Sequence, residues 1–109
     1  MIKAGIIGTG NIGTDLLLKL LKTDFIIPVI FSGRRMESNG IKLAKKRGIN
    51  ITDKGIKFFI DNPYYCDVVY DCTSAEDAKK HAKIFKSQGI KEIDLTPAKV
   101  GDLCVPNIN

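Results

Sequence analysis

Residues 8–13 read Gly8-Thr9-Gly10-Asn11-Ile12-Gly13 and connect two apolar segments of different character. The segment before them, Ile2–Ile7, is a short apolar run typical of a strand. The segment after them, from Ile12 to Leu21, carries its apolar residues at helical spacing. Strand, glycine turn and helix in this order form a dinucleotide-binding fingerprint. The stretch therefore predicts a nucleotide site at this turn.

Each glycine of the turn has a separate task in such a site. Gly8 permits a tight turn, because no Cβ opposes unusual backbone angles. Gly10 lets a pyrophosphate approach the backbone, and Gly13 lets the helix pack closely on the strand. The helix then directs unpaired amides and a positive dipole end toward the phosphates.

Composition indicates one globular domain over residues 1–109, since 44% of residues are hydrophobic and 27% charged. No apolar run approaches the ~20 residues that a membrane span needs. The N-terminus enters a strand directly, so we expect no signal peptide and a cytoplasmic protein. The net charge is +5, but the basic clusters lack the aromatic platforms or motifs of nucleic-acid binding. We expect neither nucleic acid nor membrane as a partner.

The cysteines and the single histidine offer little material for chemistry. Cys66, Cys72 and Cys104 show no CxxC pair or metal spacing, which favours reduced thiols over disulfides. Cys66 and Cys72 bracket a strand as small hydrophobes, and Cys104 has no visible base, so all three are interpreted as structural. His81 lies on a lysine-rich helix and is expected to be solvated. We expect no metal site and no catalytic residue in this chain.

The rest of the chain alternates strands and helices. Further strands are expected at 25–31, beginning near or after Pro28 because proline lacks an amide donor, and at 49–52, 66–72 and 91–95. The first helix should direct an apolar stripe toward the sheet. The stripe consists of Ile12, Leu16, Leu17, Leu20 and Leu21.

Three further helices are expected between these strands. Ser38 or Asn39 can cap one that runs to about Arg47 and ends at Gly48. A lesser helix should begin at Asp53 and stop at Asn62-Pro63. Thr73 and Glu76 have capping-box spacing for a third, which ends at Gly89. That helix should turn inward the residues Ala75, Ala78, Ala82 and Phe85.

Strands alternating with helices predict an α/β fold, a Rossmann-type doubly wound parallel sheet with strand order 3-2-1-4-5. Ligands of such sheets bind beyond the carboxyl ends of the strands, where the strand order reverses. Three segments should meet there: residues 8–13, 32–35 and 72–75. Thr96-Pro97 should follow at the next strand end.

Four separated stretches resemble the acylating, CoA-dependent acetaldehyde dehydrogenases. They are Gly8 to Leu16, Asp71-Cys72-Thr73-Ser74-Ala75, Ile93-Asp94-Leu95-Thr96-Pro97-Ala98, and Val100-Gly101 followed by Cys104-Val105-Pro106-Asn107. The resemblance implies a family that oxidises acetaldehyde to acetyl-CoA with NAD, often in complex with an aldolase. It covers the whole chain but only the N-terminal cofactor domain of that family.

The resemblance also implies roles for individual residues. Thr9, Gly10, Asn11 and Ile12 match the family's NAD-contacting turn, and Thr73 and Ser74 would lie near the nicotinamide. The family's nucleophile sits in a Cys-Gly-Gly segment, whereas this chain has no Cys-Gly pair. The reaction needs that thiol, hydride transfer to the nicotinamide, and CoA to attack the thioester. We expect the isolated chain to bind cofactor without turnover.

Two questions stay open at the level of sequence. The chain could instead be a stand-alone nucleotide- or CoA-binding regulatory module, or a fragment whose site serves nothing, because fold does not fix function. The choice between NAD and NADP is also open. The segment Ser32-Gly33-Arg34-Arg35 has no acid for the adenosine ribose, and Arg35 stands where the family has Asp. Arg34 and Arg35, with the nearby Ser32 hydroxyl, could pair with a 2′-phosphate, although both could simply face solvent.

Overall fold

The computed structural model of the chain describes residues 1–95 and the short strand at 103–104. The predicted segment Thr96-Pro97-Ala98 and the side chain of Cys104 lie outside this part. The elements run in the order β1 (Ile2–Ile7), α1 (Asn11–Leu20), β2 (Ile26–Ser32), α2 (Asn39–Lys46), β3 (Ile51–Thr52), α3 (Ile56–Asp61), β4 (Val68–Asp71), α4 (Ala75–Ser87), β5 (Glu92–Asp94) and β6 (Leu103–Cys104).

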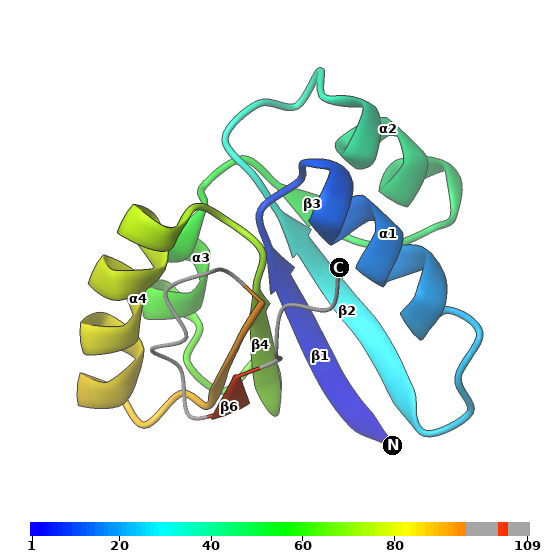
Figure 1. Cartoon of the computed structure of the whole chain (residues 1–109). Helices are drawn as coiled ribbons and strands as arrows, with labels where there is room; N and C mark the ends of the chain where they lie inside the picture. Colours follow the sequence, from blue (N-terminus) through cyan, green and yellow to red (C-terminus); the bar gives the residue numbers. More distant parts are fainter. Residues whose placement is uncertain (96–102, 105–109) are drawn as a thin grey trace.

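The strands form one parallel sheet in the order β3-β2-β1-β4-β5-β6. The predicted order 3-2-1-4-5 is confirmed. The two-residue strand β6 extends the sheet beyond β5 and was not among the predicted strands. Figure 1 shows the carboxyl ends of β1 and β2 directed toward the glycine turn and the loops above it.

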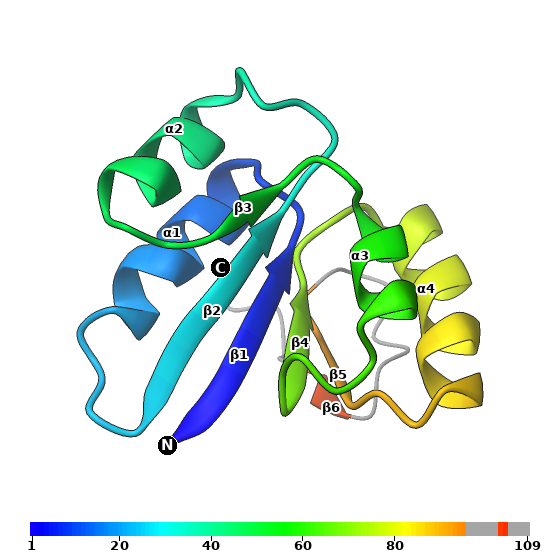
Figure 2. The same cartoon turned by 180° about the vertical axis from the view of Figure 1, so that it is seen from behind.

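Helices cover both faces of the sheet, as Figures 1 and 2 show from opposite sides. Alternate residues of β1 divide between the two cores, because successive side chains of a strand point to opposite faces. Ile6 packs on the α1–α2 side with Leu17, Phe31 and Ile41. Ile7 packs on the α3–α4 side, together with Phe59 and Phe85. The sheet is therefore doubly wound, as predicted.

Pro28 lies inside β2 rather than at its start. β1 and β2 shift register there, since Ala4 pairs with Pro28 while Gly5 pairs with Ile30, leaving Val29 as an extra residue. β3 pairs only with Phe31 and Ser32, so no described strand covers the outer edge of β2 at Pro28. A strand tolerates proline at such a bulge and at a free edge, because neither place needs its missing amide.

Two other expectations about helices are wrong in detail. Ile12 is 56% exposed and does not face the sheet; the buried residues of α1 are Gly13, Leu17 and Leu20. The lesser helix α3 begins at Ile56 instead of Asp53, because Gly55 takes a positive φ of 58° immediately before it.

The cap of α2 is Ser38, one of the two predicted candidates. Its Oγ accepts a hydrogen bond from the Ile41 amide at 3.2 Å.

The close packing of α1 on β1 gives the first prediction. A Cβ on residue 13 would overlap the carbonyl oxygen of Gly8, whereas a Cβ on residue 10 would meet no atom within 4 Å. Gly13→Ala should cost about 2–3 kcal/mol of unfolding free energy through overpacking. Gly10→Ala, at the N-cap of the same helix, should cost less than about 1 kcal/mol. Urea unfolding of both variants measures the difference, and equal stabilities would contradict it.

Candidate functional site

A cavity of ≈ 510 Å³ opens at the carboxyl ends of β1, β2 and β4. Its volume is within the range of small-molecule sites. Four connecting segments line it, and they follow β1, β2, β3 and β4. The lining residues are Ile7, Gly8, Thr9, Gly10, Ser32, Gly33, Arg34, Arg35, Ser38, Asp53, Lys54, Gly55, Ile56, Cys72, Thr73, Ser74, Asp77 and His81.

The glycine turn forms one wall of this cavity. Gly8 has a φ of 105°, and a Cβ there would stand 2.7 Å from the backbone of Cys72, so the turn touches the end of β4. Gly10 borders open space, as a residue beside a pyrophosphate should. No side chain of the described residues caps α1, so its first amides remain available to an anion. The turn thus fits a dinucleotide phosphate.

The other residues predicted from the turn have different positions. Asn11 and Ile12 are exposed on the first turn of α1 and do not line the cavity. Thr9 does line it, and its side chain lies against the loop after β2. A Cβ on Gly33 would come within 2.5 Å of the Thr9 side chain, and the Ser38 hydroxyl lies 3.3 Å from that of Thr9. Thr9 therefore joins the glycine turn to the second loop of the site.

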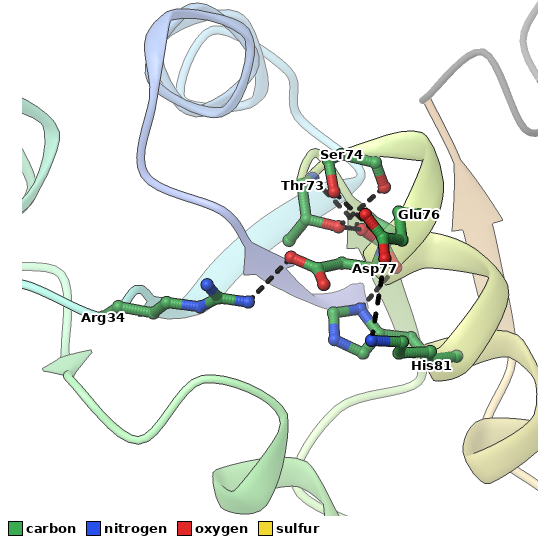
Figure 3. A network of polar contacts seen from close by, with 8 residues as sticks. Arg34, Thr73, Ser74, Glu76, Asp77 and His81 are labelled. Carbon is green, nitrogen blue, oxygen red and sulfur yellow. Dashed lines mark hydrogen bonds and ion pairs between the residues drawn. The ribbon is translucent and has the colours of Figure 1, made fainter.

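The loop after β2 brings two guanidinium groups to the cavity mouth. Arg34 Nη2 lies 2.7 Å from Asp77 Oδ2, so Arg34 reaches across the cavity to α4 (Figure 3). Arg35 is exposed and forms no ion pair within the described residues. Ser32 is fully buried, and its hydroxyl donates to the Gly55 carbonyl oxygen at 2.8 Å. That hydroxyl is therefore already engaged.

Thr73 and Ser74 stand between β4 and α4, and the predicted cap of the helix, Thr73, is wrong. Ser74 is the N-cap: its Oγ accepts a hydrogen bond from the Asp77 amide at 3.1 Å. The Thr73 hydroxyl donates a hydrogen bond to Asp71 Oδ1, and the Thr73 amide donates a second one to the same oxygen at 3.1 Å. Thr73 cannot cap the helix, because the buried carboxylate of Asp71 holds it.

His81 is buried, contrary to the expectation of a solvated side chain. Its exposed fraction is 8%, and its Nδ1 lies 2.9 Å from Asp71 Oδ2. Burial alone would raise the pKa of Asp71, but hydrogen bonds from His81, Glu92 and Thr73 lower it below its usual value. Asp71 is thus an ionised carboxylate inside the protein, and His81 is its partner.

Eight lining residues were not predicted as part of the site: Ile7, Ser38, Asp53, Lys54, Gly55, Ile56, Asp77 and His81. Four of them follow β3, a strand of only two residues. Ligands of such sheets bind at loops that follow the carboxyl ends of the strands, so the same rule could have predicted this loop. Asp77 and His81 are one helical turn apart on α4, and their common face could have been recognised from the i, i+4 spacing.

The cysteines described here are unsuited to nucleophilic chemistry. Burial, with the neighbouring charges of Asp71 and Asp94, raises the pKa of Cys72 to about 12. Burial, with the charge of Asp67, raises the pKa of Cys66 to about 11. A reactive thiol needs a depressed pKa, because the thiolate is the nucleophile. Both side chains therefore act as small hydrophobes.

The described residues form neither a metal-binding cluster nor a membrane-spanning helix. No three of their His, Cys, Asp or Glu side chains are grouped so as to hold a metal ion. None of the helices in the described part is long and apolar enough to cross a membrane.

A parallel doubly wound sheet, a glycine turn with open space at Gly10, and a cavity at the strand-order reversal define a dinucleotide-binding Rossmann domain. The family model described as "Semialdehyde dehydrogenase, NAD binding domain" matches residues 3–109. The chain belongs to this family.

Relatives of known name share nearly half of the sequence. The chain is 45% identical to acetaldehyde dehydrogenase of Pectobacterium atrosepticum over 99% of its own length and 36% of that protein. It is 47% identical to acetaldehyde dehydrogenase 2 of Salinispora arenicola, over 99% of its own length and 37% of that protein. It thus spans about a third of these relatives. A probable dehydrogenase from Thermotoga maritima shares the fold, with a TM-score of 0.77 and 24% identity over 89% of this chain and 28% of that one.

The raised thiol pKa values give the second prediction. With a pKa of about 11 or higher, roughly one thiol in a thousand or fewer is ionised at about pH 8. In a Cys104→Ser background, Cys66 and Cys72 should therefore react slowly with an aromatic disulfide reagent. Both should react quickly after unfolding in urea, which serves as the control. Rapid labelling of Cys72 in the folded protein would show an activated thiol and overturn the structural interpretation.

Proposed function

We propose that this chain is the cofactor-binding domain of an acylating acetaldehyde dehydrogenase. Such an enzyme converts acetaldehyde, CoA and NAD to acetyl-CoA and NADH. The observation that carries the proposal is the glycine turn, with its open space at Gly10, in a chain 45–47% identical to acetaldehyde dehydrogenases. A cytoplasmic location, CoA as co-substrate and an aldolase that supplies the aldehyde are parts of the same proposal.

Each loop of the cavity would hold a different part of the cofactor. Gly8, Gly10 and the first amides of α1 would bind the pyrophosphate. Arg34 and Arg35 would lie toward the adenosine ribose, and the loop of Thr73 and Ser74 toward the nicotinamide. The bound nicotinamide would accept the hydride. The described cysteines supply no nucleophile, so the thiol would come from another part of the enzyme.

A stand-alone nucleotide- or CoA-binding module is the second candidate. Three cations, Arg34, Arg35 and Lys54, line the cavity. They would also suit the phosphorylated ribose of CoA, because guanidinium groups pair well with phosphate. Titration with CoA in parallel with NAD and NADP separates the two proposals.

The third prediction concerns binding and turnover. The chain should bind NAD or NADP but should not reduce either with acetaldehyde and CoA. Gly10→Val should abolish dinucleotide binding, because its side chain would fill the space beside the turn. Calorimetric titration measures binding, and the circular dichroism and melting temperature of the variant show whether it is folded.

Two outcomes would contradict this prediction. Unchanged affinity in a folded Gly10→Val variant would remove the turn from the site. Steady turnover that disappears in Cys72→Ser or Cys104→Ser would place a nucleophile in this chain.

The fourth prediction concerns the choice of dinucleotide. NADP should bind at least as tightly as NAD, because the loop after β2 has arginines in place of an acid. Asp77 already pairs with Arg34, so of the two arginines Arg35 is the one left for a 2′-phosphate. Arg35→Ala should weaken NADP binding by about tenfold, and Arg34→Ala by less. The double variant Arg34→Ala/Arg35→Ala should remove any preference for NADP over NAD.

Arg47→Ala is the matched control, since Arg47 follows α2 and does not line the cavity. It removes the same charge and should leave the NADP to NAD ratio unchanged at low and moderate salt. If NAD binds tenfold tighter than NADP to the unmodified protein, the arginines do not read the phosphate.

A further inference from the structure

The cavity contains a buried carboxylate–imidazole pair for which the glycine turn and the arginines provide no role. His81 lies on the inward face of α4 with Ala78 and Phe85, and its ring centre is 6.1 Å from that of Phe85. Its Nδ1 is 2.9 Å from Asp71 Oδ2 at the end of β4. His81 also lines the cavity, one turn along α4 from Asp77 (Figure 3).

The surroundings of Asp71 fix which nitrogen of His81 carries the proton. Asp71 Oδ1 accepts the amide and the hydroxyl of Thr73, and these hydrogen bonds, with those of His81 and Glu92, lower the pKa of Asp71. An ionised carboxylate only accepts hydrogen bonds, so Nδ1 must donate. In a neutral imidazole the other nitrogen, Nε2, is then an acceptor.

Nε2 makes no hydrogen bond to any described residue, although the residue that bears it is more than nine-tenths buried. The cavity is the open space beside it. The charged groups around it come from every neighbouring element. Asp77 precedes it on α4 and is held by Arg34; Asp53 and Lys54 line the cavity from the loop after β3; Asp71 and Glu92 are behind it on β4 and β5. On α3 the charged residues Lys57 and Asp61 pair with each other at the surface.

An acceptor in this place selects a donor on the ligand. A fully ionised phosphate only accepts hydrogen bonds and cannot donate to Nε2, whereas the exocyclic amino group of adenine is a donor. This end of the cavity lies between the loops after β2 and β3 and α4, the side on which such folds hold the adenosine ribose. We propose that His81, oriented by Asp71, recognises the adenine base: its Nε2 accepts a hydrogen bond from the 6-amino group. This inference rests on the proposed binding of a dinucleotide.

Nicotinamide hypoxanthine dinucleotide is the probe that isolates this contact. It differs from NAD in the base, where a carbonyl oxygen replaces the 6-amino group and N1 carries a proton, so position 6 offers an acceptor in place of a donor. At about pH 8 the protein should bind NAD about tenfold more tightly than the hypoxanthine analogue, as expected for one buried hydrogen bond. AMP should show the same preference over inosine monophosphate, which assigns the contact to the adenosine half.

Asp71→Asn gives the sharpest test, because it should reverse the preference. Thr73 would keep the amide oxygen of the new side chain, so the amide nitrogen would face His81 and donate to Nδ1. His81 would then carry its proton on Nε2 and donate it to the carbonyl oxygen of hypoxanthine. An Asp-to-Asn change in a serine protease triad shifts the tautomer of its histidine in the same way. A role of Asp71 in folding alone would weaken both ligands equally.

His81→Phe should show no preference between NAD and the hypoxanthine analogue. Lys83→Ala, an exposed change on the same helix, should behave like the unmodified protein.

The outcomes separate this inference from the function on which it rests. Equal binding of NAD and the hypoxanthine analogue to the unmodified protein overturns the role of His81 and leaves the dinucleotide site intact. A preference that survives in His81→Phe does the same. Failure to bind any dinucleotide overturns both.

Discussion

The close contact between Gly8 and Gly13 is the constraint on which the cavity depends. The carbonyl oxygen of Gly8 fills the space where a side chain on residue 13 would begin, so α1 rests directly on the end of β1. Gly8 itself lies against Cys72 and Thr73, close enough that any Cβ would collide with their backbone. Two glycines therefore set how closely β1, α1 and β4 meet. Because α1 begins at this junction without a side-chain cap, its free amides are directed at the same space that Gly10 leaves open.

Thr9 extends this constraint to the second half of the site. Gly33 and Gly40 lie so near to Thr9 that a Cβ on either would come within 2.5 Å of its atoms. The loop after β2 can therefore fold onto the glycine turn, and Ser38 adds a hydrogen bond at 3.3 Å between hydroxyl groups. This contact keeps Arg34 and Arg35 at the cavity mouth. The three glycines of the turn thus belong to a set of five, and two of these, Gly33 and Gly40, leave room for Thr9.

The sequence predicted the sheet well because β1, β2 and β4 are largely apolar runs, as strands of a parallel sheet are, and Gly48 and Gly89 marked where α2 and α4 stop. It predicted the cavity residues less well, because partners distant in the chain decide them. His81 was expected in water on account of its lysine neighbours, yet it lies between Ala78 and Phe85 on the inward face and meets Asp71 there. Thr73 had the spacing of a cap, but the same carboxylate takes its hydroxyl and leaves the cap to Ser74. A single buried group, Asp71, accounts for both errors.

Asp71 also explains why a polar cluster persists inside so small a domain. A buried charge adds little net stability even when it is paired, because desolvation offsets much of the attraction. What such a network does provide is a single arrangement of the elements it joins. Asp71 ends β4 and is hydrogen-bonded to the loop before α4 through Thr73 and to α4 through His81, and Glu92 of β5 helps to lower the pKa of its carboxyl. The first turn of α4 carries Ser74 and Asp77, and through Asp77 it holds Arg34 on the opposite side of the cavity. The carboxylate therefore fixes α4 against the sheet where the cavity needs a rigid wall, and an apolar residue at position 71 could not replace it in that role.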